Sequence, residues 1–325
     1  MDGLPQRVSI REVGLRDGLQ NEAPLPTEAK VRLLEALAST GVPRIELTAF
    51  VSPRAVPAMA DAAAMAAAAG TFRDDGPEFS ALVASPGGAR RAVDAGITTV
   101  EYVVSASDGH SRANVKATTD EALARTSGVA DIVHGAGGRL EVIIATAWDC
   151  PFDGPTDPDR TVRVAAGALA LGADSLAVAD TIGTATPGRV TALISRIRVE
   201  LSPSAAQPIT LGAHFHNTRG AGLACAWAAV QAGVTQLDAA VGGFGGCPFA
   251  PGASGNIATE ELVYLLDDSG IATGIDLEAA LAAAALVEEI VGRPGASNLL
   301  RAGDRKRGRT PVSTDLNTIA SDAAS

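Results

Sequence analysis

The sequence predicts an α/β protein, a (β/α)8 TIM barrel with a short C-terminal helical extension. Short β-rich runs alternate with longer helical stretches eight times along the 325 residues, as this barrel requires. Several helical stretches end in a glycine that an apolar residue follows into the next strand, as at Gly41, Gly96, Gly172 and Gly233. An open doubly wound sheet is the alternative, but no Gly-x-Gly-x-x-Gly turn follows the first strand.

Each strand is expected where β-branched and other apolar residues form a short run. The eight strands are predicted over Val8–Val13, Arg44–Thr48, Phe79–Ala84, Thr99–Val104, Leu140–Thr146, Ser175–Asp180, Ile209–His214 and Gln236–Val241. Helices are expected in the alanine-rich or amphipathic stretches between the strands. They are predicted over Thr27–Ser39 with Thr27 as N-cap, Val56–Ala69, Gly87–Ala95, Asp120–His134, Pro158–Leu171, Pro187–Leu201, Ala221–Ala232 and from about Ile257 onward.

The chain is predicted to hold one domain. Residues 1–293 form the barrel and end in a further helix over 276–292. Residues 294–325 are predicted to be a polar, glycine-rich and partly disordered tail that carries a cluster of basic residues.

Composition restricts the classes of function. Hydrophobic residues make up 46% of the chain, enough for a sizeable core, and the formal net charge is −11. This charge argues against binding to nucleic acid or to an anionic membrane. No apolar run is a convincing membrane span, and the N-terminus lacks the apolar stretch of a signal peptide. Three scattered cysteines do not make a disulfide framework, so a cytoplasmic location is expected.

Two histidines at the end of the seventh strand, His214 and His216, predict a metal site. Residues i and i+2 of a strand point to the same side, so both imidazoles can bind one ion. In a closed barrel, strands 1, 7 and 8 neighbour one another, which makes Asp17 the best-placed carboxylate ligand. Two nitrogen and one or two oxygen ligands suit Mg²⁺, Mn²⁺, Fe²⁺ or Zn²⁺.

A glycine-rich loop follows the eighth strand and carries Cys247 near its middle. Such a loop can fold over a substrate and deliver the thiol as a proton donor or base. The competing interpretation is a surface loop with an incidental cysteine.

Several segments together resemble motifs of the hydroxymethylglutaryl-CoA lyase family, from about Val8 to Arg293. They are Arg11–Glu22, Phe50–Pro53, Asp180–Gly183, His214–His216, and Gly245–Phe249 followed by Gly252–Asn256. Arg-Asp-Gly and His-x-His also occur in the isopropylmalate and homocitrate synthases of the same superfamily. The glycine-rich loop with Cys-Pro separates the lyases from these synthases.

The resemblance implies a divalent metal, Mg²⁺ or Mn²⁺, and a set of site residues. The implied metal ligands are Asp17, His214, His216 and Asn256, and the implied catalytic residues are Arg16, Cys247, Glu46 and Asp180. Arg16 would stabilise an enolate, and Cys247 would take part in proton transfer.

The resemblance also implies an acyl-CoA substrate and a homodimer. The residues predicted to bind substrate are Gln20, Thr48, Arg112, Asn114 and Arg219. Arg112 and Asn114 belong to the segment that resembles the CoA-binding part of the family.

Cleavage of the C2–C3 bond of a 3-hydroxyacyl thioester fits these residue types. A metal lowers the pKa of the 3-hydroxyl, a guanidinium stabilises the enolate oxygen, and an acid protonates the released carbon. The predicted activity is therefore a carbon–carbon lyase. Its predicted substrate is 3-hydroxy-3-methylglutaryl-CoA, cleaved to acetyl-CoA and acetoacetate.

The sequence departs from the family pattern near the acyl end of the site. Asn217-Thr218-Arg219-Gly220 stands where the family has Asp-Thr-Tyr-Gly, and Ala49 and Ala177 stand where serine is common. A related substrate such as citramalyl-CoA is therefore the first alternative. A condensing acyltransferase of the isopropylmalate synthase type, an Fe(II) oxygenase and a non-catalytic binding protein are the others.

Overall fold

The structure is a computed structural model that describes residues 3–72, 76–201, 209–246 and 255–303. Cys247 and the part of the predicted tail from residue 304 onward lie outside the described residues. Within the described ranges, no helix is both long and apolar enough to cross a membrane.

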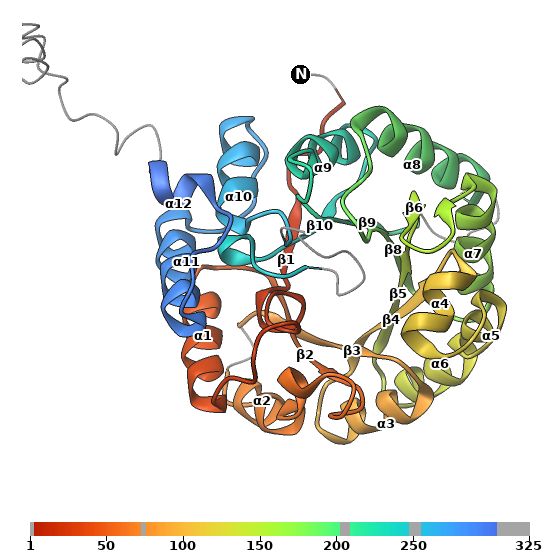
Figure 1. Cartoon of the computed structure of the whole chain (residues 1–325), viewed down its shortest axis with the longest axis horizontal. Helices are drawn as coiled ribbons and strands as arrows, with labels where there is room; N and C mark the ends of the chain where they lie inside the picture. The colour runs from red at the N-terminus through yellow and green to blue at the C-terminus, as the bar shows by residue number, and fades with distance from the viewer. Residues whose placement is uncertain (1–2, 73–75, 202–208, 247–254, 304–325) are drawn as a thin grey trace, which may run out of the picture.

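Eight parallel strands close into a barrel, and helices surround it (Figure 1). The strands are β1 (Ser9–Glu12), β2 (Arg44–Phe50), β3 (Glu78–Val83), β4 (Thr99–Ser105), β5 (Arg139–Ala145), β8 (Ser175–Asp180), β9 (Leu211–Phe215) and β10 (Gln236–Ala239). Each pairs with the next barrel strand along the chain, and β10 pairs with β1 to close the barrel. The predicted (β/α)8 barrel is confirmed.

The helices follow the strands around the outside of the barrel. They are α1 (Thr27–Ser39), α2 (Ala62–Ala69), α3 (Pro86–Asp94), α4 (Asp108–Val115), α5 (Thr119–Ala124), α6 (Thr126–Gly135), α7 (Pro158–Ala170), α8 (Pro187–Leu201), α9 (Gly222–Gln231), α10 (Thr259–Asp268), α11 (Leu277–Val291) and α12 (Asn298–Ala302). Figure 1 shows α11 beside α1, where Arg32 and Glu289 form an exposed ion pair of 3.4 Å.

The strand boundaries lie within two residues of those predicted. The four glycines that end helical stretches have positive φ angles: 81° at Gly41, 89° at Gly96, 100° at Gly172 and 91° at Gly233. Residues with a Cβ rarely adopt this conformation, so these positions require glycine for the turn into the next strand.

Some local elements differ from the prediction. The loop expected after the fourth strand contains α4, a short polar helix without a clear apolar period. Its start is held by Asp153, whose Oδ2 accepts hydrogen bonds from Ser107 Oγ (2.6 Å) and Gly109 N (2.7 Å). Because this contact comes from a residue at least 44 positions away, the local sequence does not predict the helix. The helix predicted over 120–134 is divided between α5 and α6, and a hairpin, β6 (Asp149–Cys150) with β7 (Gly154–Pro155), follows β5.

The N-cap predicted for the first helix is wrong. Pro26 occupies the N-cap position of α1, and no side chain caps the helix there. Thr27 lies inside the helix, and its hydroxyl donates instead to Asp61 Oδ2 at 2.9 Å. The proline already fixes a backbone angle suited to the chain before a helix.

The two faces of the sheet carry different side chains. In β8, Leu176 and Val178 belong to the main core between strands and helices, whereas Ala177 and Ala179 belong to a separate small apolar cluster. Successive residues of a strand point to opposite faces, so this smaller cluster lies on the inner face of the barrel. The functional groups described below share that interior.

Strand β2 contains an irregularity that changes which residues face inward. Glu46 pairs with Ser80, but Thr48 pairs with Ala81 and Ala49 with Leu82, so one extra residue is inserted in β2. Such a bulge reverses the facing of the residues after it. Without the bulge, Thr48 would face the barrel interior like Glu46. With it, Ala49 faces the interior instead.

Candidate active site

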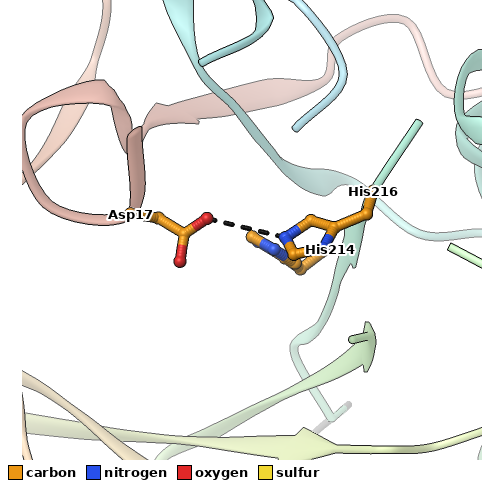
Figure 2. A group of neighbouring side chains, drawn as sticks. All are labelled: Asp17, His214 and His216. Atoms are coloured by element: carbon orange, nitrogen blue, oxygen red, sulfur yellow. Dashed lines mark ion pairs between the residues drawn. The ribbon is translucent and has the colours of Figure 1, made fainter. Parts of the chain in front are cut away.

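Three potential metal ligands converge at the carboxyl ends of the strands. His214 lies in β9 and His216 directly follows it, while Asp17 lies in a π-helical turn over Gly14–Gly18 after β1. One ligand atom from each lies within 4.8 Å of the others, and His216 Nε2 is 3.5 Å from Asp17 Oδ2. Figure 2 shows the Asp17 carboxylate pointing towards the two imidazoles. All three side chains are buried.

Asn256, the fourth predicted ligand, lies beside the other three. Its Nδ2 donates to Asp17 Oδ2 at 2.7 Å and to Phe244 O at 3.0 Å. Its Oδ1 has no hydrogen-bond partner among the described residues, and the same holds for both ring nitrogens of His216. Leaving a buried polar atom unpaired costs about 1–3 kcal/mol. A divalent ion bound by these atoms would remove that cost, so the four residues fit a metal.

The charges around this cluster also favour a cation. Within the described ranges, two buried guanidinium groups, those of Arg11 and Arg16, form ion pairs with five buried carboxylates. These carboxylates belong to Asp17, Glu46, Glu101, Glu141 and Asp238. Buried charges require partners, and a divalent ion would balance part of the excess negative charge.

Asp17 is held in its ionised form. Its Oδ1 accepts hydrogen bonds from Arg16 Nη1 and Gln20 Nε2, both at 2.8 Å. Burial alone would raise its pKa, but the Arg16 guanidinium and the nearby imidazoles of His214 and His216 lower the pKa far below the usual range for aspartate. Gln20, predicted to bind substrate, thus contacts the carboxylate of the candidate ligand Asp17 directly.

Arg16 connects Asp17, one of the candidate ligands, to Glu46. Its Nη2 lies 2.8 Å from Glu46 Oε2, while its Nε is buried with no hydrogen-bond partner among the described residues. Burial raises the pKa of Glu46 even though the Arg16 guanidinium opposes this shift. Arg16 is therefore fixed by two carboxylates and retains an unused donor.

Asp180 is buried at the end of β8 and holds the loop that follows. Its Oδ1 accepts from Thr184 N and its Oδ2 from Ala185 N, both at 3.0 Å. Burial raises its pKa, and the two backbone hydrogen bonds act against that rise. Its observed contacts are those of a residue that orders the β8–α8 loop.

A buried network beneath the ligand cluster was not singled out from the sequence. Arg11 Nη1 lies 2.7 Å from Glu101 Oε1 and 2.6 Å from Glu141 Oε1, and the guanidinium also binds Asp238. A signal was present in β4 and β5, because Glu101 and Glu141 each interrupt a run of apolar residues. Charges at inward positions of three or more strands indicate a buried polar layer, since isolated buried charges are unfavourable.

Comparison with known proteins identifies the family. The HMGL-like family model matches residues 7–287. The (R)-citramalyl-CoA lyase of Chloroflexus aurantiacus is 43% identical over 298 residues, which cover 89% of this chain and 92% of that protein. A hydroxymethylglutaryl-CoA lyase of Bacillus subtilis is 38% identical over 291 residues, which cover 89% of this chain and 95% of that protein.

The chain belongs to the HMGL-like family. A solved structure of an HMG-CoA lyase from Acinetobacter baumannii, in complex with coenzyme A and 3-methylmalate, superposes with a TM-score of 0.85 and 36% identity, covering 92% of this chain and 95% of that one. The relatives named above are carbon–carbon lyases, and this HMGL-like protein is an enzyme of that kind.

The residues in which this HMGL-like chain departs from the family pattern have clear contacts. Asn217 Oδ1 accepts a hydrogen bond from Gly222 N at 3.0 Å at the start of α9, a role that aspartate and asparagine share. Arg219 is exposed, and its Nη1 donates to the carbonyl oxygens of Ile182 (2.8 Å) and Gly183 (3.1 Å). Arg219 therefore fastens the β9–α9 loop to the β8–α8 loop.

The other predicted substrate residues lie apart from the ligand cluster. The buried Thr48 hydroxyl contacts Met59 Sδ at 3.8 Å, as the bulge in β2 explains. Arg112 and Asn114 are exposed on α4, and Arg112 lies 3.9 Å from Asp108 Oδ2. Cys150 and Cys225 are buried free thiols, while Cys247 is outside the described residues.

Proposed function

We propose that this protein cleaves a 3-hydroxy-3-methylacyl-CoA to acetyl-CoA and a keto acid. The observation that carries the proposal is the position of Arg16. It contacts the metal-ligand carboxylate of Asp17 at 2.8 Å and keeps Nε as an unused donor in a buried site. The C3 hydroxyl at the ligand cluster and the C1 thioester oxygen at Arg16 would then lie on either side of the C2–C3 bond that breaks.

The residues divide the work of this reaction. Asp17, His214, His216 and Asn256 would hold Mg²⁺ or Mn²⁺, which supplies a Lewis acid that makes a bound hydroxyl more acidic. Arg16 donates to the thioester oxygen as negative charge develops there, and Glu46 keeps the guanidinium in place. Cys247, on the glycine-rich loop, is the proposed donor of the proton to the released carbon.

The inner wall of the barrel supports the shorter of two candidate acyl groups. In citramalyl-CoA the carboxylate is attached to the hydroxyl-bearing carbon, whereas in 3-hydroxy-3-methylglutaryl-CoA it lies one methylene further away. Val103, Ile143, Ala177 and Ala179 form an apolar cluster on the inner wall, and Ala49 adds another methyl group. The carboxylate of 3-hydroxy-3-methylglutaryl-CoA would reach this wall and meet few hydrogen-bond donors there. The carboxylate of citramalyl-CoA would stay beside the hydroxyl, at the ligand cluster. The 43% identity to the (R)-citramalyl-CoA lyase supports the same choice.

A product assay with the purified full chain tests the proposal. The enzyme with Mg²⁺ or Mn²⁺ is incubated with (R)-citramalyl-CoA, (S)-citramalyl-CoA or 3-hydroxy-3-methylglutaryl-CoA, and acetyl-CoA, pyruvate and acetoacetate are quantified by mass spectrometry. We expect acetyl-CoA and pyruvate from (R)-citramalyl-CoA at the highest kcat/KM. Acetoacetate as the main keto acid would move the assignment to the longer substrate. A condensing enzyme would give a different result. It would cleave none of these three substrates, and it would release CoA when incubated with acetyl-CoA and a 2-keto acid.

The remaining parts of the proposal concern assembly and location. We propose a homodimer in the cytoplasm, with the CoA thioester as its small-molecule partner. Sedimentation of the purified chain over a range of concentrations tests the dimer.

A further inference from the structure

Asp238 of β10 joins the buried Arg11 to the metal-ligand residue His214. Its two carboxylate oxygens accept a bidentate pair from Arg11, from Nε at 2.9 Å and from Nη2 at 2.8 Å. The same Oδ2 lies 3.1 Å from His214 Nδ1. Asp238 is 6% exposed and Arg11 2% exposed, so water does not compete strongly for these contacts.

The barrel register places these three residues in one row. Arg11 pairs with Asp238 between β1 and β10, and Asp238 pairs with His214 between β10 and β9. The far side of the Arg11 guanidinium is held by Glu101 and Glu141, so the arginine cannot turn without losing several ion pairs. A bidentate contact fixes the plane of a carboxylate as well as its position.

The contacts of Asp238 determine which nitrogen of His214 donates a hydrogen bond. Both carboxylate oxygens of Asp238 accept from the Arg11 guanidinium, and Oδ2 also lies at His214 Nδ1. A carboxylate paired with a guanidinium in this way only accepts hydrogen bonds. His214 therefore donates from Nδ1, which leaves Nε2 for the ligand cluster.

We propose that Asp238 is a positioning residue that fixes the tautomer and ring plane of His214, with Arg11 orienting Asp238 in turn. His216 provides the contrast, because neither of its ring nitrogens has a hydrogen-bond partner among the described residues. The protein thus orients the imidazole of His214 through a carboxylate, whereas a bound ion would supply a partner for the imidazole of His216. The inference rests on the proposed use of a metal and deepens it.

Asp238→Asn tests this role against a matched control, Glu141→Gln. Both replace a carboxylate on Arg11 by the corresponding amide, but only Asp238 contacts His214. Mn²⁺ affinity is measured by electron paramagnetic resonance on the full chain without substrate. Loss of a partner of this kind typically weakens metal binding by about 10–100-fold. We expect a loss of that size in Asp238→Asn and less than about threefold in Glu141→Gln, with most of the kcat recovered at saturating Mn²⁺. Equal losses in the two variants would overturn the proposal.

A second measurement needs no substitution at Asp238. Long-range ¹H–¹⁵N correlation spectra of the metal-free wild-type protein report the tautomer of each imidazole, and the chain has only four histidines to assign. We expect the Nδ1–H tautomer at His214. The Nε2–H tautomer there would contradict the role of Asp238. Neither the Mn²⁺ affinity nor the tautomer is measured with a CoA thioester, so a wrong substrate assignment would leave these two outcomes unchanged.

Discussion

Arg11 and Arg16 lie five residues apart, and both are buried and paired with acidic side chains, yet their surroundings differ. Arg11 pairs through Nε, Nη1 and Nη2 with Asp238, Glu101 and Glu141. Arg16 contacts two carboxylates through its terminal nitrogens, and its Nε is unpaired among the described residues. The difference separates an arginine that holds the fold from one that retains a donor for a ligand.

The largest effect is expected when the structural arginine is replaced. Arg11→Met removes the guanidinium and leaves three buried carboxylates without it, which should lower the free energy of unfolding by about 3–5 kcal/mol. Urea denaturation measures the change. Arg16→Met is the matched control. It should lower the free energy of unfolding by less than Arg11→Met does, because Asp17 keeps its hydrogen bonds from Gln20 and Asn256. A larger stability loss in Arg16→Met than in Arg11→Met would break the comparison.

The functional arginine should show the opposite pattern. Arg16→Met should lower kcat by about 10²–10³-fold, the usual cost of removing one donor to a developing oxyanion. Mn²⁺ binding should persist, because the four ligands remain. Steady-state kinetics with the substrate found in the product assay, together with metal titration, check both parts. A kcat near that of the wild type would remove Arg16 from the reaction.

Stability should fall as pH rises because of the acids around Arg11. Burial raises the pKa of Glu101 to about 7, with Glu46 and Glu141 adding to the shift and Arg11 opposing it. The folded protein then holds a proton that the unfolded chain has released above about pH 4.5. The raised pKa of Glu101 therefore adds to the free energy of unfolding. This contribution is fully present below about pH 4.5, is lost as pH rises through 7, and amounts to roughly 1 kcal/mol or more.

Urea denaturation in EDTA between pH 5 and 8 measures this dependence without metal. We expect Glu101→Gln to lose less stability over that range than the wild type. Glu78→Gln serves as the control, because Glu78 titrates below the range measured. Burial alone would raise the pKa of Glu78, but hydrogen bonds from Arg139 and Thr99 lower it. A wild-type stability that is flat or rises between pH 5 and 8 would contradict the raised pKa of Glu101.

The smallest effect is expected at the exposed arginine. Arg219→Gln removes two hydrogen bonds to the β8–α8 loop, and exposed contacts of this kind contribute about 0.5–1.5 kcal/mol. We expect kcat/KM to fall by no more than about tenfold, with the preference between the two acyl-CoA substrates unchanged. A reversed preference would give Arg219 the substrate-binding role predicted from the sequence.

The comparison of the two arginines also shows how far the sequence predicts this molecule. The strands and the glycines at their entrances follow from local patterns of apolar residues and from the need for positive φ, so they were predicted closely. His214, His216, Asp17 and Asn256 were expected to be ligands because the two histidines share a strand face and the family motif includes the other two, and the structure brings the four side chains together. The different environments of Arg11 and Arg16 arise from side chains on four other strands, and no local pattern encodes them.

Thr48 shows a different limit of sequence analysis. Its predicted role rested on its position at the end of the second strand, and the residue inserted in β2 changes which side chains face inward there. A bulge of one residue depends on pairing with the neighbouring strand, which a single sequence does not display. The placement of Thr27 inside α1 has a similar cause, because its partner, Asp61, lies 34 residues away.

The contact between Gly183 and Thr218 has a consequence for protein engineering. A Cβ added at Gly183 would lie 2.8 Å from Thr218 Cβ, so the β8–α8 and β9–α9 loops meet without room for another atom. Randomising either loop alone would sample few viable sequences, and a library has to vary both loops together. The alanines at 49, 177 and 179, by contrast, belong to barrel strands, so substitutions there leave the sequences of both loops unchanged. Redesign of substrate preference should therefore begin on the inner wall.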